Sequence, residues 1–240
     1  MSTPQIPTVP LLIDGRRVES RTTQWREIRN PATQQLLARV PLATPDELNA
    51  AVASAKAAFA GWRTTPIGTR ARIFLKLQQL IRENMKEIAA VLTAEQGKTL
   101  ADAEGDIFRG LEVVEHAANI GTLQLGEIAN NVATGVDTYT LLQPLGVCAG
   151  ITPFNFPAMI PLWMFPMAIA CGNTFVLNPS EQDPLSTMKL VDLALAAGIP
   201  PGVLNVVHGA EEVVNGLCDH PDIKAISFVG STRVGTHVYH

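Results

Sequence analysis

Short apolar runs alternate with helical patterns in the second half of the chain. The runs are bounded by glycine, proline or polar residues, and each leads into a segment with helical spacing. The four predicted strands cover residues 146–151, 174–177, 203–207 and 225–229. Strands and helices that alternate at these distances predict a parallel sheet with right-handed crossovers. The expected fold class is therefore α/β with a Rossmann-like sheet.

The first half of the chain combines short β patterns with longer helical ones. Two predicted hairpins at residues 10–18 and 25–40 are expected to form a small N-terminal sheet. Thr44 is the expected N-cap of a helix that begins at Pro45 and continues to residue 59. Apolar residues at helical intervals predict further helices at residues 70–84, 86–95 and 100–121.

No charged side chain occurs between Thr138 and Ser180. A run of this length suggests a membrane span, but prolines recur in it every four or five residues, and each removes a backbone donor that lipid would not replace. The pattern instead predicts a helix that is apolar on all its faces and stops at Gly172. Such a helix must lie in the interior of a sizeable domain.

Asn155 is the one amide side chain at the centre of Pro153-Phe-Asn-Phe-Pro157. The prolines stiffen the backbone and the phenylalanines can exclude water, so a rigid, neutral N–H donor is available to stabilise a developing oxyanion. The alternative interpretation is that Asn155 caps the helix that follows. The spacing alone leaves both open.

Composition excludes several classes of protein. The chain has 240 residues and a formal net charge of −4, with both signs interspersed, so nucleic-acid binding has no support. Three cysteines argue against a secreted disulfide framework, and the five histidines show no ligand spacing, so no metal site is expected. The first seven residues lack a signal or transit pattern. We therefore expect a cytoplasmic location and no membrane partner.

Small and polar residues follow each predicted strand. The residues at or just beyond the strand ends are Thr152, Asn178, Gly209 and Gly230. The carboxyl ends of parallel strands meet at one edge of a sheet, where ligands bind. After Gly230, the N–H groups of the next helix and the Ser231 hydroxyl suit a phosphate. Many βα turns use the same residues only as helix caps, and the spacing is not Gly-x-Gly-x-x-Gly.

The second half of the chain contains four motifs in this order: Pro153-Phe-Asn-Phe-Pro157, Gly172-Asn-Thr174, Asn178-Pro-Ser-Glu181 and Phe228-Val-Gly-Ser-Thr232. They resemble the N-terminal half of the aldehyde dehydrogenase superfamily, and the surrounding string is most similar to its CoA-acylating methylmalonate-semialdehyde dehydrogenases. The resemblance runs from about Leu11 to the end. It implies NAD-dependent oxidation of methylmalonate or malonate semialdehyde to propionyl-CoA or acetyl-CoA, a step of valine catabolism, with coenzyme A as co-substrate.

The resemblance also implies roles for individual residues. Ser231 would meet the NAD pyrophosphate, and Thr152 and Phe154 would lie along the nicotinamide side. Glu181 would accept hydrogen bonds from ribose hydroxyls and favour NAD over NADP; its alternative role is to compensate the N-terminal charge of the next helix. The family has lysine where this chain has Asn178, which predicts weakened NAD binding. The remaining cofactor-binding residues implied are Gln182, Gly209 and Gly230.

Arg109 has two interpretations. Periodicity places it on the rim of a helix, where it would extend into solvent or pair with Glu112 or Glu115. The resemblance implies instead that its guanidinium binds the distal carboxylate of the substrate.

The resemblance divides the chain into three segments. Residues 1–121 would hold hairpins and helices that pack on the cofactor domain, and residues 146–240 the NAD-binding βα units, truncated at the C-terminus. Residues 122–145 would form a strand segment similar to the family's oligomerisation arm, so a homo-oligomer, dimer or tetramer, is expected.

The chemistry that the resemblance implies needs a cysteine that forms a thioester. Cys148, Cys171 and Cys218 all lie in apolar patterns and are expected to be packing residues, so the nucleophile would lie beyond residue 240. Two hypotheses follow. The chain is the cofactor half of a CoA-acylating semialdehyde dehydrogenase, or it is a truncated, catalytically inactive fragment that at most binds NAD.

Overall fold

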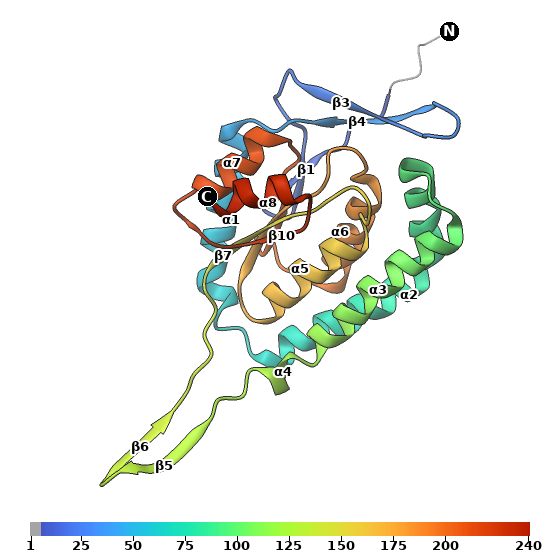
Figure 1. The fold of residues 1–240 in the computed structure, drawn as a ribbon. Coiled ribbons are helices and arrows are strands. Elements are labelled where there is room, and N and C mark those ends of the chain that lie inside the picture. The colour runs from blue at the N-terminus through green and yellow to red at the C-terminus, as the bar shows by residue number, and fades with distance from the viewer. Residues whose placement is uncertain (1–5) are drawn as a thin grey trace.

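Figure 1 shows a computed structural model that describes residues 6–240, with a central sheet, helices on both of its faces and a long two-stranded arm. The predicted α/β class is confirmed. Residues 1–5, on which the expectation of no targeting segment partly depends, lie outside the described residues.

The main sheet has the strand order β10-β7-β8-β9-β1-β2. Its parallel part consists of β7 (Val147–Ile151), β8 (Thr174–Asn178), β9 (Leu204–Val206) and β10 (Ile223–Phe228). These bounds agree with the predicted strands to within two residues. β7, β8 and β9 are buried along their whole length, which explains their continuous apolar sequences.

The first hairpin joins this main sheet, so the expectation of a single small N-terminal sheet is wrong. β1 (Leu11–Ile13) pairs with β2 (Arg16–Val18) and also, through Leu12 and Val206, with β9. β3 (Trp25–Arg29) and β4 (Leu36–Pro41) form a separate two-stranded sheet. The physical reason is that β1 covers the edge of β9 that would otherwise be unpaired, and Leu12 is buried there.

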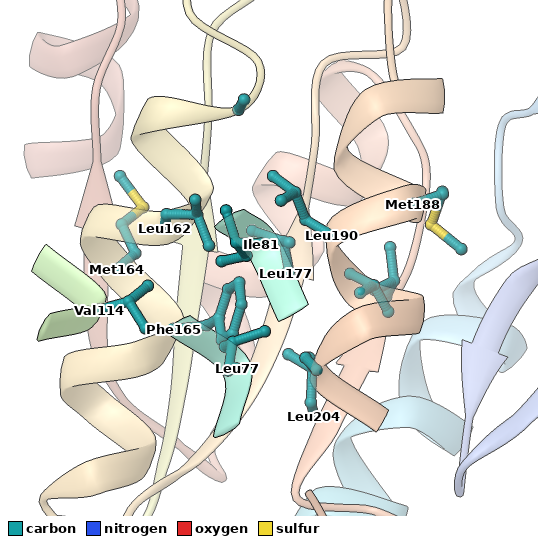
Figure 2. Close-up of a cluster of buried hydrophobic side chains, with 14 of the residues drawn as sticks. Leu77, Ile81, Val114, Leu162, Met164, Phe165, Leu177, Met188, Leu190 and Leu204 are labelled. Carbon is teal, nitrogen blue, oxygen red and sulfur yellow. The ribbon is translucent and has the colours of Figure 1, made fainter. Parts of the chain in front are cut away.

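Helices cover both faces of the sheet (Figure 1). One face carries α5 (Met159–Ala170) and α6 (Leu185–Ala197), with α2 (Ile67–Gln96) and α3 (Leu100–Ala118) packed outside them. The other face carries α1 (Pro45–Trp62) and α7 (Glu211–Asp219), and α8 (Thr232–Tyr239) follows β10. Figure 2 shows the core of the first face, where Phe165 of α5 lies among Leu77 of α2 and Leu177 of β8.

The observed ends of the helices agree only in part with those predicted from the sequence. Thr44 and Glu47 form a reciprocal capping box at the predicted start of α1. The two helices predicted at residues 70–84 and 86–95 are one helix, α2, because no glycine or proline separates them. The helix predicted at residues 100–121 ends earlier, and Asn119 separates α3 from the short α4 (Ile120–Leu123).

α5 is the buried apolar helix that the charge-free run predicts. It has 12 residues and is followed closely by Gly172, whose φ of 95° ends the helical path. A helix of this length spans about 18 Å, less than the roughly 30 Å of a bilayer core. Among residues 6–240, no helix is both long and apolar enough to cross a membrane.

The arm consists of β5 (Ile128–Ala133) and β6 (Val136–Tyr139), which pair with each other and extend away from the rest of the molecule (Figure 1). Every residue of both strands is exposed. The arm lies within the segment predicted at residues 122–145, while the division of the chain into three functional segments stays a prediction.

Candidate cofactor and active site

The carboxyl ends of the parallel strands meet at one edge of the sheet, as predicted. Ile151 at the end of β7 is in register with Asn178 of β8 and with Phe228 of β10. The chain runs from β7 through β8 to β9 and then returns to place β10 on the other side of β7. A sheet of this kind binds ligands at such a reversal, outside the carboxyl ends of the strands. Thr152 follows β7 directly, at this point.

Two buried polar side chains at this edge have unsatisfied atoms. Thr152 is 6% exposed and Asn178 is 3% exposed, and within the described residues neither Thr152 Oγ1 nor Asn178 Oδ1 has a hydrogen-bond partner. The two strand ends are held together, because the Thr152 N–H donates to the Asn178 carbonyl oxygen over 3.2 Å. Unpaired buried polar atoms are costly, so this edge fits a ligand that supplies hydrogen-bonding groups.

The turn after β10 has the helix-cap role that the sequence left open. Ser231 is the N-cap of α8, and its hydroxyl oxygen accepts a hydrogen bond from the Val234 N–H over 3.4 Å. The turn is exposed, so the helix N-terminus also remains open to an anion. A Cβ at Gly230 would lie 2.5 Å from the Phe228 ring, and one at Gly209 would lie 2.2 Å from Val213, so a side chain at either position would have to displace its neighbour.

Glu181 forms an ion pair that the sequence did not predict. Its Oε1 lies 2.6 Å from Arg26 Nη1 of β3. The alternative role proposed for Glu181, at the start of α6, belongs to Glu95 instead: its two carboxylate oxygens each accept a backbone N–H, from Leu185 and from Ser186, over 2.7 Å. Glu95 comes from the end of α2, so no local sequence signal near α6 reveals this contact.

A groove of about 410 Å³ lies beside this ion pair. Phe154 and Gln182, both predicted to bind the cofactor, line it together with Arg26, Arg29 and Asp183. Burial, and after it the nearby charge of Glu95, raise the pKa of Asp183 to about 8. Burial also raises the pKa of Glu95 to about 7. These two buried acids were missed because Glu95 and Asp183 lie far apart in the sequence and meet only in the folded chain.

Asn155 is exposed, and Phe154 beside it is 52% exposed. The expectation that the phenylalanines keep Asn155 dry is therefore not met by the described residues, since the loop faces outward. Asn155 does not cap α5 either: the N-cap position is Ala158, with no side-chain cap, and the Met159 N–H donates to Asp106 Oδ1 over 2.7 Å. The Asn155 side chain is thus left available to a ligand.

Arg109 lies on the exposed face of α3, beside α5. Its carbonyl oxygen accepts a hydrogen bond from the Trp163 indole over 3.1 Å. The suggested pairing with Glu112 or Glu115 is not found among the described residues, where Glu115 instead binds Arg82 of α2 at 2.8 Å. Among the described residues the Arg109 guanidinium has no ion-pair partner, and the exposed side chain of Phe108 adjoins it in the sequence.

The three cysteines have the environments of packing residues. Burial raises the pKa of Cys148 to about 11, and burial also raises the pKa of Cys171 and of Cys218. Thiols of this kind are poor nucleophiles, because the reactive thiolate is disfavoured.

Known proteins similar to this chain share both its sequence and its fold. The family model described as "Aldehyde dehydrogenase family" matches residues 18–240. The chain is 59% identical over 237 residues to the mitochondrial methylmalonate-semialdehyde dehydrogenase [acylating] of Arabidopsis thaliana, covering 98% of this chain and 39% of that protein. The chain therefore spans less than half the length of this curated relative.

Solved structures of aldehyde dehydrogenases are similar to this chain in fold and sequence. The crystal structure of methylmalonate-semialdehyde dehydrogenase from Oceanimonas doudoroffii has a TM-score of 0.95 and 44% identity, over 98% of this chain and 48% of that one. The NAD+ complex of an aldehyde dehydrogenase from Bacillus cereus has a TM-score of 0.91 and 33% identity, over 97% of this chain and 48% of that one.

The names of the curated relatives correct one expectation. The proteins from Arabidopsis thaliana, Rattus norvegicus and Homo sapiens are each named as mitochondrial, which points to a mitochondrial location instead of the predicted cytoplasmic one. The prediction failed because it relied on a few residues at the start of the sequence given.

Proposed function

Because the chain belongs to the aldehyde dehydrogenase family, we propose that it forms the cofactor half of a CoA-acylating dehydrogenase for methylmalonate or malonate semialdehyde. The names of its relatives support the substrate, and the word "acylating" in those names supports coenzyme A as co-substrate. Propionyl-CoA or acetyl-CoA would be the product, which fits a role in valine catabolism.

The observation that carries this proposal is the pair of unsatisfied buried oxygens, Thr152 Oγ1 and Asn178 Oδ1, at the carboxyl edge of β7 and β8. They would bind NAD together with the helix N-terminus at Ser231. When bound, NAD supplies the hydride acceptor for aldehyde oxidation. Gln182 and Phe154, at the adjoining groove, would complete the cofactor site together with Gly209 and Gly230.

Glu181 would face the adenosine ribose in this proposal. Glu181 forms an ion pair with Arg26. The positive charge of this arginine would reduce the repulsion that Glu181 alone would exert on a 2′-phosphate. We therefore expect NAD to be preferred over NADP by a smaller margin than an unpaired glutamate would give.

Asn155 would donate its side-chain N–H to the oxygen of the aldehyde as negative charge develops there. Removal of one such donor typically lowers kcat by about 100- to 1000-fold. Arg109, without an ion-pair partner among the described residues, would bind the distal carboxylate of the substrate through two N–H donors. These two residues would fix the two ends of the substrate.

The nucleophilic cysteine would come from outside these 240 residues, because Cys148, Cys171 and Cys218 have raised pKa values. A second candidate function follows from this. A protein limited to this chain would bind NAD without turning over aldehyde.

The arm would pair with a second copy of the chain, as a dimer or within a tetramer. Its large exposed apolar side chains support this use. They are Ile128, Val132, Val136 and Tyr139, and the segments that flank the arm add Leu125, Leu141, Leu142 and Leu145.

The first experiment measures the intact mass of the protein from its natural source and its NADH formation with methylmalonate semialdehyde, with and without coenzyme A. The isolated 240-residue chain is expected to bind NAD in calorimetry but to form no NADH. Turnover by that chain, purified to homogeneity, would contradict our assignment of the nucleophile. Absence of NAD binding would contradict the proposal itself.

The substrate assignment is tested with Arg109→Leu in the intact protein. The variant should raise KM at least tenfold for methylmalonate semialdehyde but leave KM for uncharged propanal within about twofold, since only the former has a carboxylate to lose. Arg82→Leu, which breaks a surface ion pair on the neighbouring helix, is the control. Equal effects on both aldehydes would refute the role of Arg109.

A further inference from the structure

Lys98, in the turn between α2 and α3, reaches the loop that carries Asn155. Its Nζ donates to the Asn155 carbonyl oxygen over 2.9 Å and lies 2.7 Å from Asp106 Oδ2. The same ammonium is 4.6 Å from the centre of the Phe156 ring. The Lys98 side chain is only 12% exposed, so these contacts are largely shielded from water.

Asp106, on α3, is the other half of this arrangement. Its side chain is fully buried, and its second oxygen, Oδ1, accepts the Met159 N–H over 2.7 Å. Met159 is the first residue of α5. One ion pair therefore holds the segment at two points, at the carbonyl of Asn155 and at the start of the helix that follows.

This arrangement differs from an ordinary helix cap. A serine or aspartate at residue 158 would satisfy the first N–H groups of α5 locally, yet the chain has alanine there and uses a buried carboxylate from another helix. Burying two charges carries a large desolvation penalty, which only good geometry and full hydrogen bonding offset. A local cap would not also hold the Asn155 carbonyl, whereas the lysine does.

We propose that Lys98 and Asp106 are positioning residues that orient the Asn155 side chain toward the reacting carbonyl oxygen. The inference rests on the proposed function of Asn155 as the oxyanion donor. Because the Asn155 peptide is held at its carbonyl and the chain is held again at Met159, rotation of the intervening backbone is restricted. The donor is thus pre-oriented before charge develops, which is the condition for electrostatic stabilisation without reorganisation.

The test is Lys98→Met in the intact protein, which keeps much of the apolar stem but removes the charge and the donor. We expect kcat to fall about 10- to 100-fold, as for a donor misplaced by about 1 Å, with the NAD dissociation constant within twofold of wild type. Lys98→Arg should recover part of the loss. Lys189→Met, which removes a surface ion pair with Glu87, is the matched control and should leave kcat unchanged.

A double-mutant cycle with Asn155→Ala separates positioning from general stability. If Lys98 acts through Asn155, Lys98→Met should lower kcat no further when Asn155 is already alanine. Multiplicative losses in the double variant would overturn the proposal, and so would a kcat within twofold of wild type in the Lys98→Met variant.

Amide hydrogen exchange distinguishes failure of this inference from failure of the proposed function. In the intact protein, Lys98→Met should speed exchange at Met159 and Ile160, whose N–H groups bond to Asp106 and to the Phe156 carbonyl oxygen, at least tenfold and leave α1 unaffected. If wild-type protein has no aldehyde activity, the proposed function fails, while faster exchange would still support the restraint on the loop. Unchanged exchange would refute the restraint itself.

Discussion

Asp183 offers a quantitative test of the buried acids beneath the groove. It is 2% exposed, and its Oδ1 has no hydrogen-bond partner within the described residues. Burial, and then the charge of Glu95, raise the pKa of Asp183 from an ordinary value of 3.8 to about 8. The folded protein therefore retains a proton at neutral pH that the unfolded chain releases.

The sign of the effect follows from this difference. Between pH 3.8 and pH 8 the folded state binds more protons than the unfolded state, so the free energy of unfolding falls as pH rises through this window. At ~1.4 kcal/mol per pH unit, Asp183 accounts for a loss of ~4 kcal/mol between pH 5 and pH 8. For a domain of this size that loss is equivalent to a fall in Tm of roughly 8–16 °C.

Asp183→Asn removes the titration while keeping the shape of the side chain. Urea unfolding followed by circular dichroism at pH 5, 6.5 and 8 should show a stability difference, variant minus wild type, that grows by ~4 kcal/mol from the lowest to the highest pH. Asp192→Asn, at a side chain that is 45% exposed, is the control and should change stability by less than about 1 kcal/mol at every pH.

A difference between Asp183→Asn and wild type that stays constant across this pH range would refute the reasoning. It would mean that Asp183 is ionised in the folded state, with a counter-charge or water that offsets its burial.

Two further predictions concern cofactor binding and helix packing. Asn178→Lys should tighten the NAD dissociation constant about tenfold, the equivalent of one charge-assisted hydrogen bond, and an unchanged constant in calorimetry would show that Asn178 does not weaken binding. Gly110→Ala would place a Cβ 2.7 Å from Leu162, so we expect a loss of ~1–3 kcal/mol in urea unfolding. A Cβ at Gly105, on the same helix, meets open space, so Gly105→Ala should raise the free energy of unfolding by up to ~1 kcal/mol. Equal effects of the two substitutions would contradict the packing of α3 on α5.

Elements governed by nearby residues were predictable. The capping box of Thr44 and Glu47 spans three residues, and the parallel strands are short apolar runs between turns, so their signals lie within one window of sequence. The carboxyl edge followed from the same runs, because alternation with helices requires parallel crossovers. Its cofactor assignment came from the resemblance to a family, and the roles of its individual residues stay predictions.

Errors occurred where a partner lies far away in the sequence. Leu12 of β1 pairs with Val206 of β9, which removed the expected N-terminal sheet. Glu95 caps α6, the role suggested for Glu181, and Arg82 holds the carboxylate that was suggested for Arg109. In each case the competing local interpretation was chemically reasonable, and only proximity in space selected the actual partner.

Local sequence patterns specify the kinds of elements, predict a ligand at the carboxyl edge of the sheet, and supply the functional groups of Asn155 and Arg109. Only the folded chain brings Lys98 to the Asn155 carbonyl oxygen and Asp106 to the Met159 N–H. Helix propensity and capping act only between residues that are a few positions apart in the sequence. Ion pairs and strand edges are satisfied by whichever groups the folded chain brings together.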